Sequence, residues 1–313
     1  MDSALAILYP GQGSQRVGMG EELRAEFPDL YDPWLSEADA ASGLPIQRYC
    51  REGPQETLTR TEVAQPALFA VSLALTELAR SKGIAARMVA GHSLGEYTSA
   101  VACGCLRPED GMRLVCERGR LMAQFQAERP GSMAAVLGLA IDRLQELCHQ
   151  ASGEGVAVVA NLNSPTQMVV SGDDAAVELV TAMVQAEKGG KAIRLQTGAA
   201  FHSPLMKPVQ ERLAAYMKDL AWSDPDLPLV ANASAEALTS GQAIRQALID
   251  QIASPVRWSE CVTTLRAAGC DTFLELGPGR VLSGLVRQIA PEAKTFAADS
   301  PAKIVEFTSS MSS

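Results

Sequence analysis

The chain has 313 residues, 47% of them hydrophobic and 20% charged, and it carries a formal net charge of −9. This composition predicts a globular protein that buries one large core and a smaller one. The acidic balance argues against a nucleic-acid partner, because phosphate binding needs concentrated Lys and Arg. The apolar run 4–9 is too short to span a bilayer, and no other stretch has about 18 uninterrupted apolar residues. We therefore expect a cytoplasmic protein with no membrane partner.

Short apolar runs alternate with amphipathic stretches along most of the chain, which predicts an α/β fold with a parallel sheet. The expected elements are a strand at 4–9, a helix at 61–82 broken near Pro66, a strand at 87–90, helices at 95–102 and 107–126, and strands at 227–231 and 272–276. The turn Gly277-Pro278-Gly279 precedes the last predicted helix.

Between residues 132 and 196 the order of elements changes. Strands are expected at 133–137, 156–160, 167–171 and 191–195, with helices at 142–150 and 174–186. This βαββαβ order predicts a small ferredoxin-like subdomain, 131–198, inserted into a larger α/β-hydrolase-like domain formed by 1–130 and 199–300. The Ser-rich segment 301–313 is expected to be a flexible tail.

The seven cysteines lack the paired CxxC or Cys/His spacing of zinc sites and disulfide frameworks. We expect free, buried thiols in a reducing compartment and no metal site.

The motif Gly91-His92-Ser93-Leu94-Gly95 lies where a predicted strand turns into a predicted helix. It matches the G-x-S-x-G nucleophile elbow, in which small flanking residues permit a strained turn that exposes the serine hydroxyl. The turn also directs helix N-terminal amides at the serine, so the amide of Leu94 can stabilise an oxyanion. The pattern also occurs by chance, but its position between strand and helix favours Ser93 as a nucleophile.

A nucleophilic serine needs a base, and the chain has only three histidines. His92 is adjacent to Ser93, so its side chain is expected to point away and pack against the elbow. His149 falls on the polar side of a predicted helix and is expected to be solvated. His202 lies in a predicted loop before a helix, from which it can reach Ser93. Elimination and position both indicate His202 as the base.

No carboxylate stands out as the third member of a triad, so we expect a backbone carbonyl to orient the imidazole of a Ser–His dyad. A second oxyanion donor is expected on a tight turn beside the elbow. The turn Gly11-Gln12-Gly13, after the first strand, supplies one, with the amide of Gln12 as donor. A phosphate-binding loop is the weaker alternative, because GxGxxG is absent and no Lys follows.

Together these motifs resemble the malonyl-CoA:acyl carrier protein transacylase family, which includes discrete bacterial fatty-acid enzymes and the acyltransferases of polyketide synthases. The resemblance covers nearly the whole chain and rests on the order and spacing of short motifs at 10–15, 65–67, 91–97, 118–119, 163–165, 201–206, 255–258 and 276–279.

The resemblance implies a role for each matching position. The central roles fall on Ser93 as nucleophile, His202 as base, and Gln12 and Leu94 as oxyanion amides. The backbone carbonyl that holds the family's histidine falls on Gln251. Gln65 matches a glutamine of the acyl pocket, and Asn163 matches an asparagine near the histidine.

The family's arginine for the free malonyl carboxylate matches Arg118, and a guanidinium offers two parallel donors that fit a carboxylate. The alternative is a surface arginine on an amphipathic helix, and Arg113 and Arg120 are nearby competitors.

The resemblance also bears on the side chain of the substrate. In the polyketide members, Phe at the position of Phe201 and an aliphatic residue at that of Leu94 go with malonyl, whereas Ser and Gln go with methylmalonyl. The phenyl ring crowds the α-carbon and leaves no room for a methyl group. Ala199 departs from the malonyl-selective modular enzymes, which usually carry His there.

The implied reaction is a ping-pong transfer of malonyl from malonyl-CoA to the phosphopantetheine thiol of an acyl carrier protein, with no bound cofactor. The stretches 201–206 and 251–258 favour polyketide synthesis in trans, and fatty-acid synthesis is the alternative. Two rivals are a carrier-protein thioester hydrolase of the same fold, which would not need Arg118, and a non-catalytic docking module.

Overall fold

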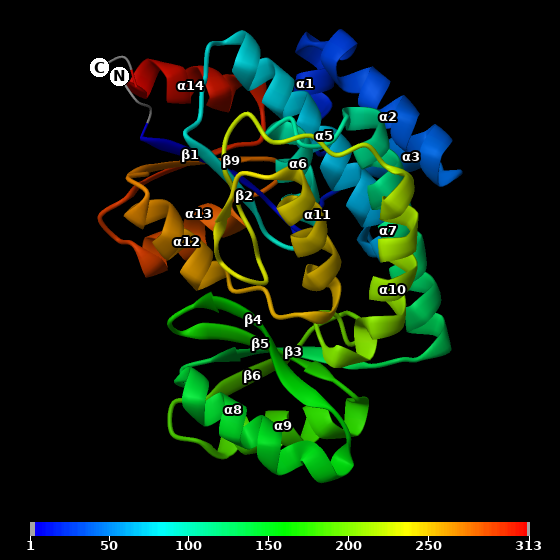
Figure 1. The fold of residues 1–313 in the computed structure, drawn as a ribbon, viewed down its shortest axis with the longest axis vertical. Coiled ribbons are helices and arrows are strands. Elements are labelled where there is room, and N and C mark those ends of the chain that lie inside the picture. The colour runs from blue at the N-terminus through cyan, green and yellow to red at the C-terminus, as the bar shows by residue number, and fades with distance from the viewer. Residues whose placement is uncertain (1–3, 312–313) are drawn as a thin grey trace.

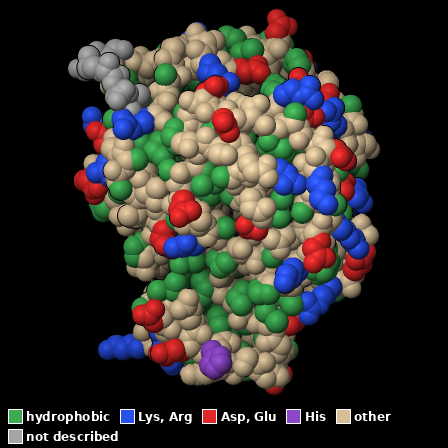
Figure 2. All heavy atoms as spheres, viewed as in Figure 1, with side chains coloured by type: hydrophobic (Ala, Val, Ile, Leu, Met, Phe, Trp, Pro, Cys, Tyr) green, Lys and Arg blue, Asp and Glu red, His purple; other side chains and the backbone are tan. Residues whose placement is uncertain are grey.

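The computed structural model describes residues 4–311, and the predicted domain ends at 1–3 and 312–313 lie outside it. The described chain forms two lobes, each built on its own sheet (Figure 1). Figure 2 shows acidic and basic side chains interspersed over one face of both lobes, with apolar side chains gathered where the lobes meet.

The larger sheet has the strand order β10-β9-β1-β2-β7-β8. Its strands are β1 (Leu5–Tyr9), β2 (Met88–Gly91), β7 (Leu229–Val230), β8 (Ala237–Leu238), β9 (Thr272–Leu276) and β10 (Lys294–Ala298). Neighbours pair in parallel except β7 and β8, which are antiparallel. Because β1 and β2 are parallel neighbours, the turns that follow them lie at the same edge of the sheet, where ligands bind in open α/β folds.

Helices cover both faces of this sheet (Figure 1). They are α1 (Glu21–Glu26), α2 (Pro28–Ser42), α3 (Ile46–Glu52), α4 (Gln55–Thr59), α5 (Thr61–Ser81), α6 (Leu94–Ala102), α7 (Pro108–Glu128), α10 (Lys207–Tyr216), α11 (Gly241–Asp250), α12 (Trp258–Ala267), α13 (Val281–Ile289) and α14 (Pro301–Met311). Side chains of β1 alternate between the faces. Ile7 and Tyr9 pack in the core that contains α5 and α6, whereas Ala6 and Leu8 pack in the core that contains α12 and α13.

The smaller sheet is antiparallel, with the order β4-β5-β3-β6. Its elements are β3 (Ser132–Leu137), α8 (Ile141–Gln150), β4 (Ala157–Ser164), β5 (Gln167–Gly172), α9 (Asp174–Ala186) and β6 (Lys191–Arg194). One face packs against α8 and α9 around a core of its own that includes Leu144 and Val180. The predicted α/β fold with a ferredoxin-like βαββαβ subdomain is confirmed.

The strand β4 connects the smaller sheet to the larger lobe by backbone hydrogen bonds to Val256, which lies outside both sheets. The amide of Val256 donates to Ala160 O at 2.8 Å, and the amide of Leu162 donates to Val256 O at 2.9 Å. These backbone bonds fix the smaller sheet against the segment that follows α11.

The prediction of a flexible tail from residue 301 is wrong. Residues Pro301–Met311 form α14, in which Ile304 and Phe307 are buried. Phe307 packs edge-on against Phe296 of β10, with ring centroids 5.0 Å apart. The strand β10 was not predicted, and it supplies Phe296, the apolar partner of α14. The helix predicted after Gly279 is therefore followed by one more strand and one more helix.

The helix α5 runs unbroken through Pro66, contrary to the predicted interruption. Pro66 is in the second turn, so the missing amide removes one early helical hydrogen bond, and buried contacts along the helix offset the loss. In the described chain, α5 alone is long and apolar enough to cross a membrane, but 89% of that window is buried within the protein. It is a core helix. All seven cysteines are buried and free, as predicted.

Candidate active site

A cleft of about 460 Å³ lies between the turn-bearing edge of the larger sheet and the open face of the smaller one. Residues of both lobes line it, among them Gly11, Gln12, Ser93, Arg118 and His202 from the larger lobe and Met133, Asn161, Asn163 and Val169 from the smaller. The cleft therefore collects most of the residues that the sequence singled out.

The turn between β2 and α6 carries Ser93 in a strained backbone conformation, with φ of 51°. The two flanking glycines make the turn possible. A Cβ on Gly91 would lie 1.9 Å from the carbonyl oxygen of Gly95, and a Cβ on Gly95 would lie 2.0 Å from Tyr9 O. Only glycine permits so close an approach of strand and helix, which is the predicted elbow.

Gly91→Ala is expected to lower the free energy of unfolding by about 3 kcal/mol or more, because the methyl group collides with backbone that cannot move away. Gly284→Ala in α13 is the matched control. A Cβ there meets nothing within 4 Å, so helix propensity should leave stability unchanged or raise it by up to about 1 kcal/mol. Denaturant unfolding measures both, and equal midpoints for Gly91→Ala and the unsubstituted protein would refute the steric argument.

His202 precedes the short 3-10 turn Pro204–Met206 and reaches the elbow across the cleft. Its Nε2 lies 2.7 Å from Ser93 Oγ, and its Nδ1 lies 2.9 Å from the backbone oxygen of Gln251. A carbonyl oxygen can only accept, so Nδ1 carries the proton and Nε2 is left to accept from the serine hydroxyl. His202 also has a positive φ, 57°.

His202 is only 5% exposed. Burial, together with the positive charge of Arg118, lowers the pKa of His202 to about 3. The ring is therefore neutral at physiological pH, which is the form that a general base requires.

The two predicted oxyanion donors border the serine. Leu94 is the first residue of α6, so its amide has no partner within the helix. The turn of Gln12 packs closely on the elbow, because a Cβ on Gly11 would lie 2.4 Å from His92 O. Within residues 4–311, the amides of Gln12 and Leu94 make no hydrogen bond, so both are free to bind a ligand oxygen.

Arg118 points inward from α7 and is 1% exposed. Its Nη1 donates to Gln65 Oε1 at 2.6 Å, and its Nη2 donates to Ser93 Oγ and to Gln251 Oε1, each at 3.1 Å. Its guanidinium lies 4.9 Å from the ring centroid of Tyr97. None of these hydrogen-bond partners is a carboxylate. The positive charge of the buried Arg118 guanidinium is therefore not neutralised by any of them.

The competing arginines of α7 are on the surface. Arg113 pairs with Asp110, and Arg120 pairs with Glu117. The structure thus brings Arg118 alone among the three to the cleft.

The remaining predicted residues are nearby. Gln65 is fully buried and donates to Thr61, which in turn donates to the side chain of Gln12. Phe201 is buried and lines the cleft. Asn163 lines the cleft together with His202, and its Oδ1 lies 2.8 Å from Nε2 of the elbow histidine, His92.

The other two histidines are placed as predicted. His92 stacks at a tilt on Trp258, with ring centroids 5.6 Å apart, and burial lowers its pKa. His149 is exposed on α8. Among residues 4–311, neither of these imidazoles makes a hydrogen bond to Ser93.

Two residues that were not predicted from the sequence hold the elbow in place. Asn232 Oδ1 accepts from the amide of Ser93 at 2.7 Å, and its Nδ2 donates to Gly91 O at 2.7 Å. Glu96 is fully buried in α6, and its Oε2 accepts from the amide of Asn232 at 3.2 Å. An acidic residue in a helix that is otherwise uncharged was the signal for Glu96. The sequence signal for Asn232 was weaker and consisted of its position just after β7, the strand that pairs with β2.

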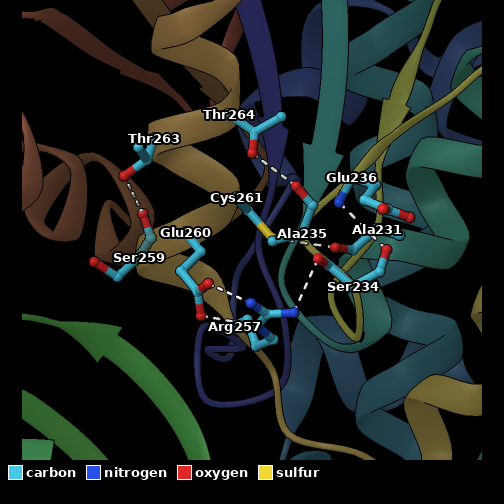
Figure 3. A network of polar contacts seen from close by, with 10 residues as sticks. All are labelled: Ala231, Ser234, Ala235, Glu236, Arg257, Ser259, Glu260, Cys261, Thr263 and Thr264. Carbon is cyan, nitrogen blue, oxygen red and sulfur yellow. Dashed lines mark hydrogen bonds and ion pairs between the residues drawn. The ribbon is translucent and has the colours of Figure 1, made fainter.

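The β7–β8 turn that carries Asn232 is anchored on α12 (Figure 3). Arg257 Nη1 donates to Ser234 O at 3.0 Å, and Thr264 Oγ1 donates to Ala235 O at 2.7 Å. The sulfur of Cys261 contacts Ala231 O at 3.3 Å. These contacts with α12 hold the β7–β8 turn in place, and so they fix the position of Asn232, which hydrogen-bonds to the elbow.

Comparison with known proteins agrees with this geometry. Residues 7–303 match the model of the acyl transferase domain. A malonyl CoA-acyl carrier protein transacylase of Bacillus subtilis is 40% identical over 306 residues, covering 96% of this chain and 95% of the relative. The crystal structure of a malonyl-CoA:acyl carrier protein transacylase from Xanthomonas oryzae superposes with a TM-score of 0.94 at 39% identity, covering 98% of each chain.

A third similar protein is a malonyl-transacylase solved in complex with a type II polyketide synthase acyl-carrier protein. It has a TM-score of 0.92 and 34% identity, and the match covers 97% of this chain and 98% of the other. Fold and site together define an acyltransferase. The chain belongs to the acyl transferase domain family and, within it, to the malonyl-CoA:acyl carrier protein transacylases.

Proposed function

We propose that this transacylase works through a malonyl-serine intermediate, with Ser93 as nucleophile and His202 as base. The observation that carries the proposal is the 2.7 Å contact between Ser93 Oγ and a neutral His202 whose other nitrogen is held by Gln251 O. A serine hydroxyl is a weak nucleophile until such a base removes its proton.

In the first half-reaction, Ser93 Oγ attacks the thioester carbonyl of malonyl-CoA while His202 Nε2 takes its proton. The amides of Gln12 and Leu94 stabilise the negative charge on the carbonyl oxygen. The C–S bond then breaks, His202 returns the proton to the sulfur, and coenzyme A leaves.

In the second half-reaction, the phosphopantetheine thiol of an acyl carrier protein gives its proton to His202 and attacks the malonyl-serine ester. The ester bond breaks, Ser93 recovers its proton, and malonyl remains on the carrier protein. The same pair therefore serves both halves, which requires no metal or bound redox cofactor.

Arg118 is proposed to bind the free carboxylate of the malonyl group. Its Nη2 is 3.1 Å from the nucleophile, so the ester and the carboxylate of one short chain could reach Ser93 and Arg118 together. A guanidinium without a carboxylate partner in a buried site favours an anionic ligand. Phe201 in the cleft wall is proposed to limit room at the α-carbon.

One experiment distinguishes a malonyl transferase from a thioester hydrolase. The protein is incubated with malonyl-CoA, its intact mass is measured, and the loaded protein is then chased with or without a holo-acyl carrier protein. We expect one malonyl group per chain, retained in buffer and transferred quickly to the carrier protein. Absence of an adduct would contradict catalysis by Ser93, and release of free malonate at the same rate in both chases would indicate a hydrolase.

For the pathway, we propose supply of malonyl to polyketide synthases in trans, in the cytoplasm, with fatty-acid synthesis as the alternative. The stretches 201–206 and 251–258 favour the polyketide enzymes. Because the carrier protein is the substrate that differs between pathways, kcat/KM for carrier proteins of each type distinguishes them.

A further inference from the structure

The side chain of Gln251 makes contacts that its backbone role does not require. Its Oε1 accepts from Arg118 Nη2 at 3.1 Å. Its Nε2 donates to the carbonyl oxygen of Ser93 at 2.8 Å and to Glu96 Oε2 at 2.6 Å. One fully buried amide therefore touches the arginine, the elbow and a buried acid.

The orientation of this amide is determined by its neighbours. Ser93 O can only accept, and Glu96 Oε2 already accepts from the amide of Asn232, so both require the NH₂ group of Gln251. The amide oxygen must then face Arg118, which can only donate. Reversing the amide would set donor against donor on one side and acceptor against acceptor on the other.

The buried acid would otherwise compete with the substrate. Glu96 would be negatively charged if it lost its proton, whereas Arg118 is positively charged, and both contact Gln251, which lies between them. A direct ion pair would occupy guanidinium donors that a substrate carboxylate needs. Glu96 Oε1 has no hydrogen-bond partner within the described chain, and burial raises the pKa of Glu96 to about 8. Both features suit a carboxyl group kept in its neutral form.

We propose that the Gln251 side chain is a positioning residue that holds Arg118 beside Ser93 and separates it from Glu96. The inference rests on the proposed binding of the malonyl carboxylate by Arg118. It adds that the anion selectivity of the site depends on a neutral spacer between two buried ionisable groups.

Gln251→Met tests the positioning. Methionine has similar length but cannot form these hydrogen bonds, and the backbone carbonyl that orients His202 remains. We expect KM for malonyl-CoA to rise at least about tenfold in the transfer to carrier protein, with kcat within about threefold. A merely structural role would lower kcat and the melting temperature without this split. Gln246→Met on the exposed side of α11, where the glutamine side chain donates to Asp250 at 2.9 Å, is the matched control.

A double variant tests the separation. In Gln251→Met, Glu96 loses the amide that faces it and can pair with Arg118. Adding Glu96→Gln removes the carboxyl group that could lose its proton to form this pair, so KM should fall back several-fold from the single-variant value. Glu96→Gln alone keeps an acceptor oxygen for Gln251 and should change KM less than Gln251→Met.

Two results would overturn the inference: an unchanged KM in Gln251→Met, or a double variant no better than the single one. If Gln251→Met does not fold, Gln251→Asn, whose amide is one methylene too short to reach both neighbours, replaces it. Failure of the proposed function is distinguishable, because the unsubstituted protein would then form no malonyl adduct at all.

Discussion

Ser93→Ala is expected to abolish the malonyl adduct and to reduce transfer to carrier protein by at least about 10⁴-fold. The substitution removes the hydroxyl oxygen that lies 2.7 Å from His202 Nε2 and is proposed to attack the thioester. Alanine fits the space of the serine, and removing a polar group from a strained functional site seldom destabilises a protein. The melting temperature should therefore be retained.

His202→Ala should cost a similar factor, because the serine loses its base. The double variant should be no less active than either single one, since residues that act as a unit are not additive. Stopped-flow acylation together with intact-mass measurement tests all three variants. A malonyl adduct on Ser93→Ala would place the nucleophile elsewhere in the chain.

Arg118→Ala is expected to lower kcat/KM for malonyl-CoA by about 30- to 150-fold, which corresponds to the roughly 2–3 kcal/mol of a charge-assisted hydrogen bond. Activity toward acetyl-CoA should persist or increase, because a neutral acyl group has no carboxylate to pair and gains from the removal of a buried cation. The measurement is the ratio of the two kcat/KM values.

Two variants of the same helix serve as comparisons. Arg120→Ala removes a surface arginine that pairs with Glu117, and should leave the ratio unchanged. Arg118→Lys keeps the charge but loses the planar, two-pronged donor, and should give an intermediate ratio. An equal loss for malonyl and acetyl in Arg118→Ala would show that the residue only supports the fold.

Local patterns in the sequence were enough to predict much of the fold. Alternation of apolar runs with amphipathic stretches predicted the α/β class, and the order of strands and helices between 132 and 196 predicted the ferredoxin-like subdomain. Glycine spacing around Ser93 predicted the elbow, because the turn needs residues without a Cβ at those two positions. The scarcity of histidine reduced the choice of base to His202.

Prediction failed where a segment depends on a partner that is distant in the sequence. The C-terminal segment contains Ser and few strong signals, yet Ile304 and Phe307 lie one turn apart on a face that packs against Phe296. Because β10 was not predicted from the sequence, that face had no predicted packing partner. The sequence alone therefore did not distinguish a packed helix from a frayed tail. Pro66 likewise suggested a break, because the burial that holds α5 together is invisible in its local sequence.

The sequence by itself indicated many of the strands and helices, the elbow and His202 as the candidate base, since strand and helix periods, glycine turns and a short list of histidines are local properties. The family resemblance favoured Arg118 over Arg113 and Arg120, and the tertiary structure places Arg118 beside the serine. Only the tertiary structure revealed that the side chain of Gln251 lies between Arg118 and Glu96, and that Asn232 hydrogen-bonds to the elbow. These contacts join residues tens to more than a hundred positions apart. Their geometry follows from how helices and sheets pack, which periodicity does not encode.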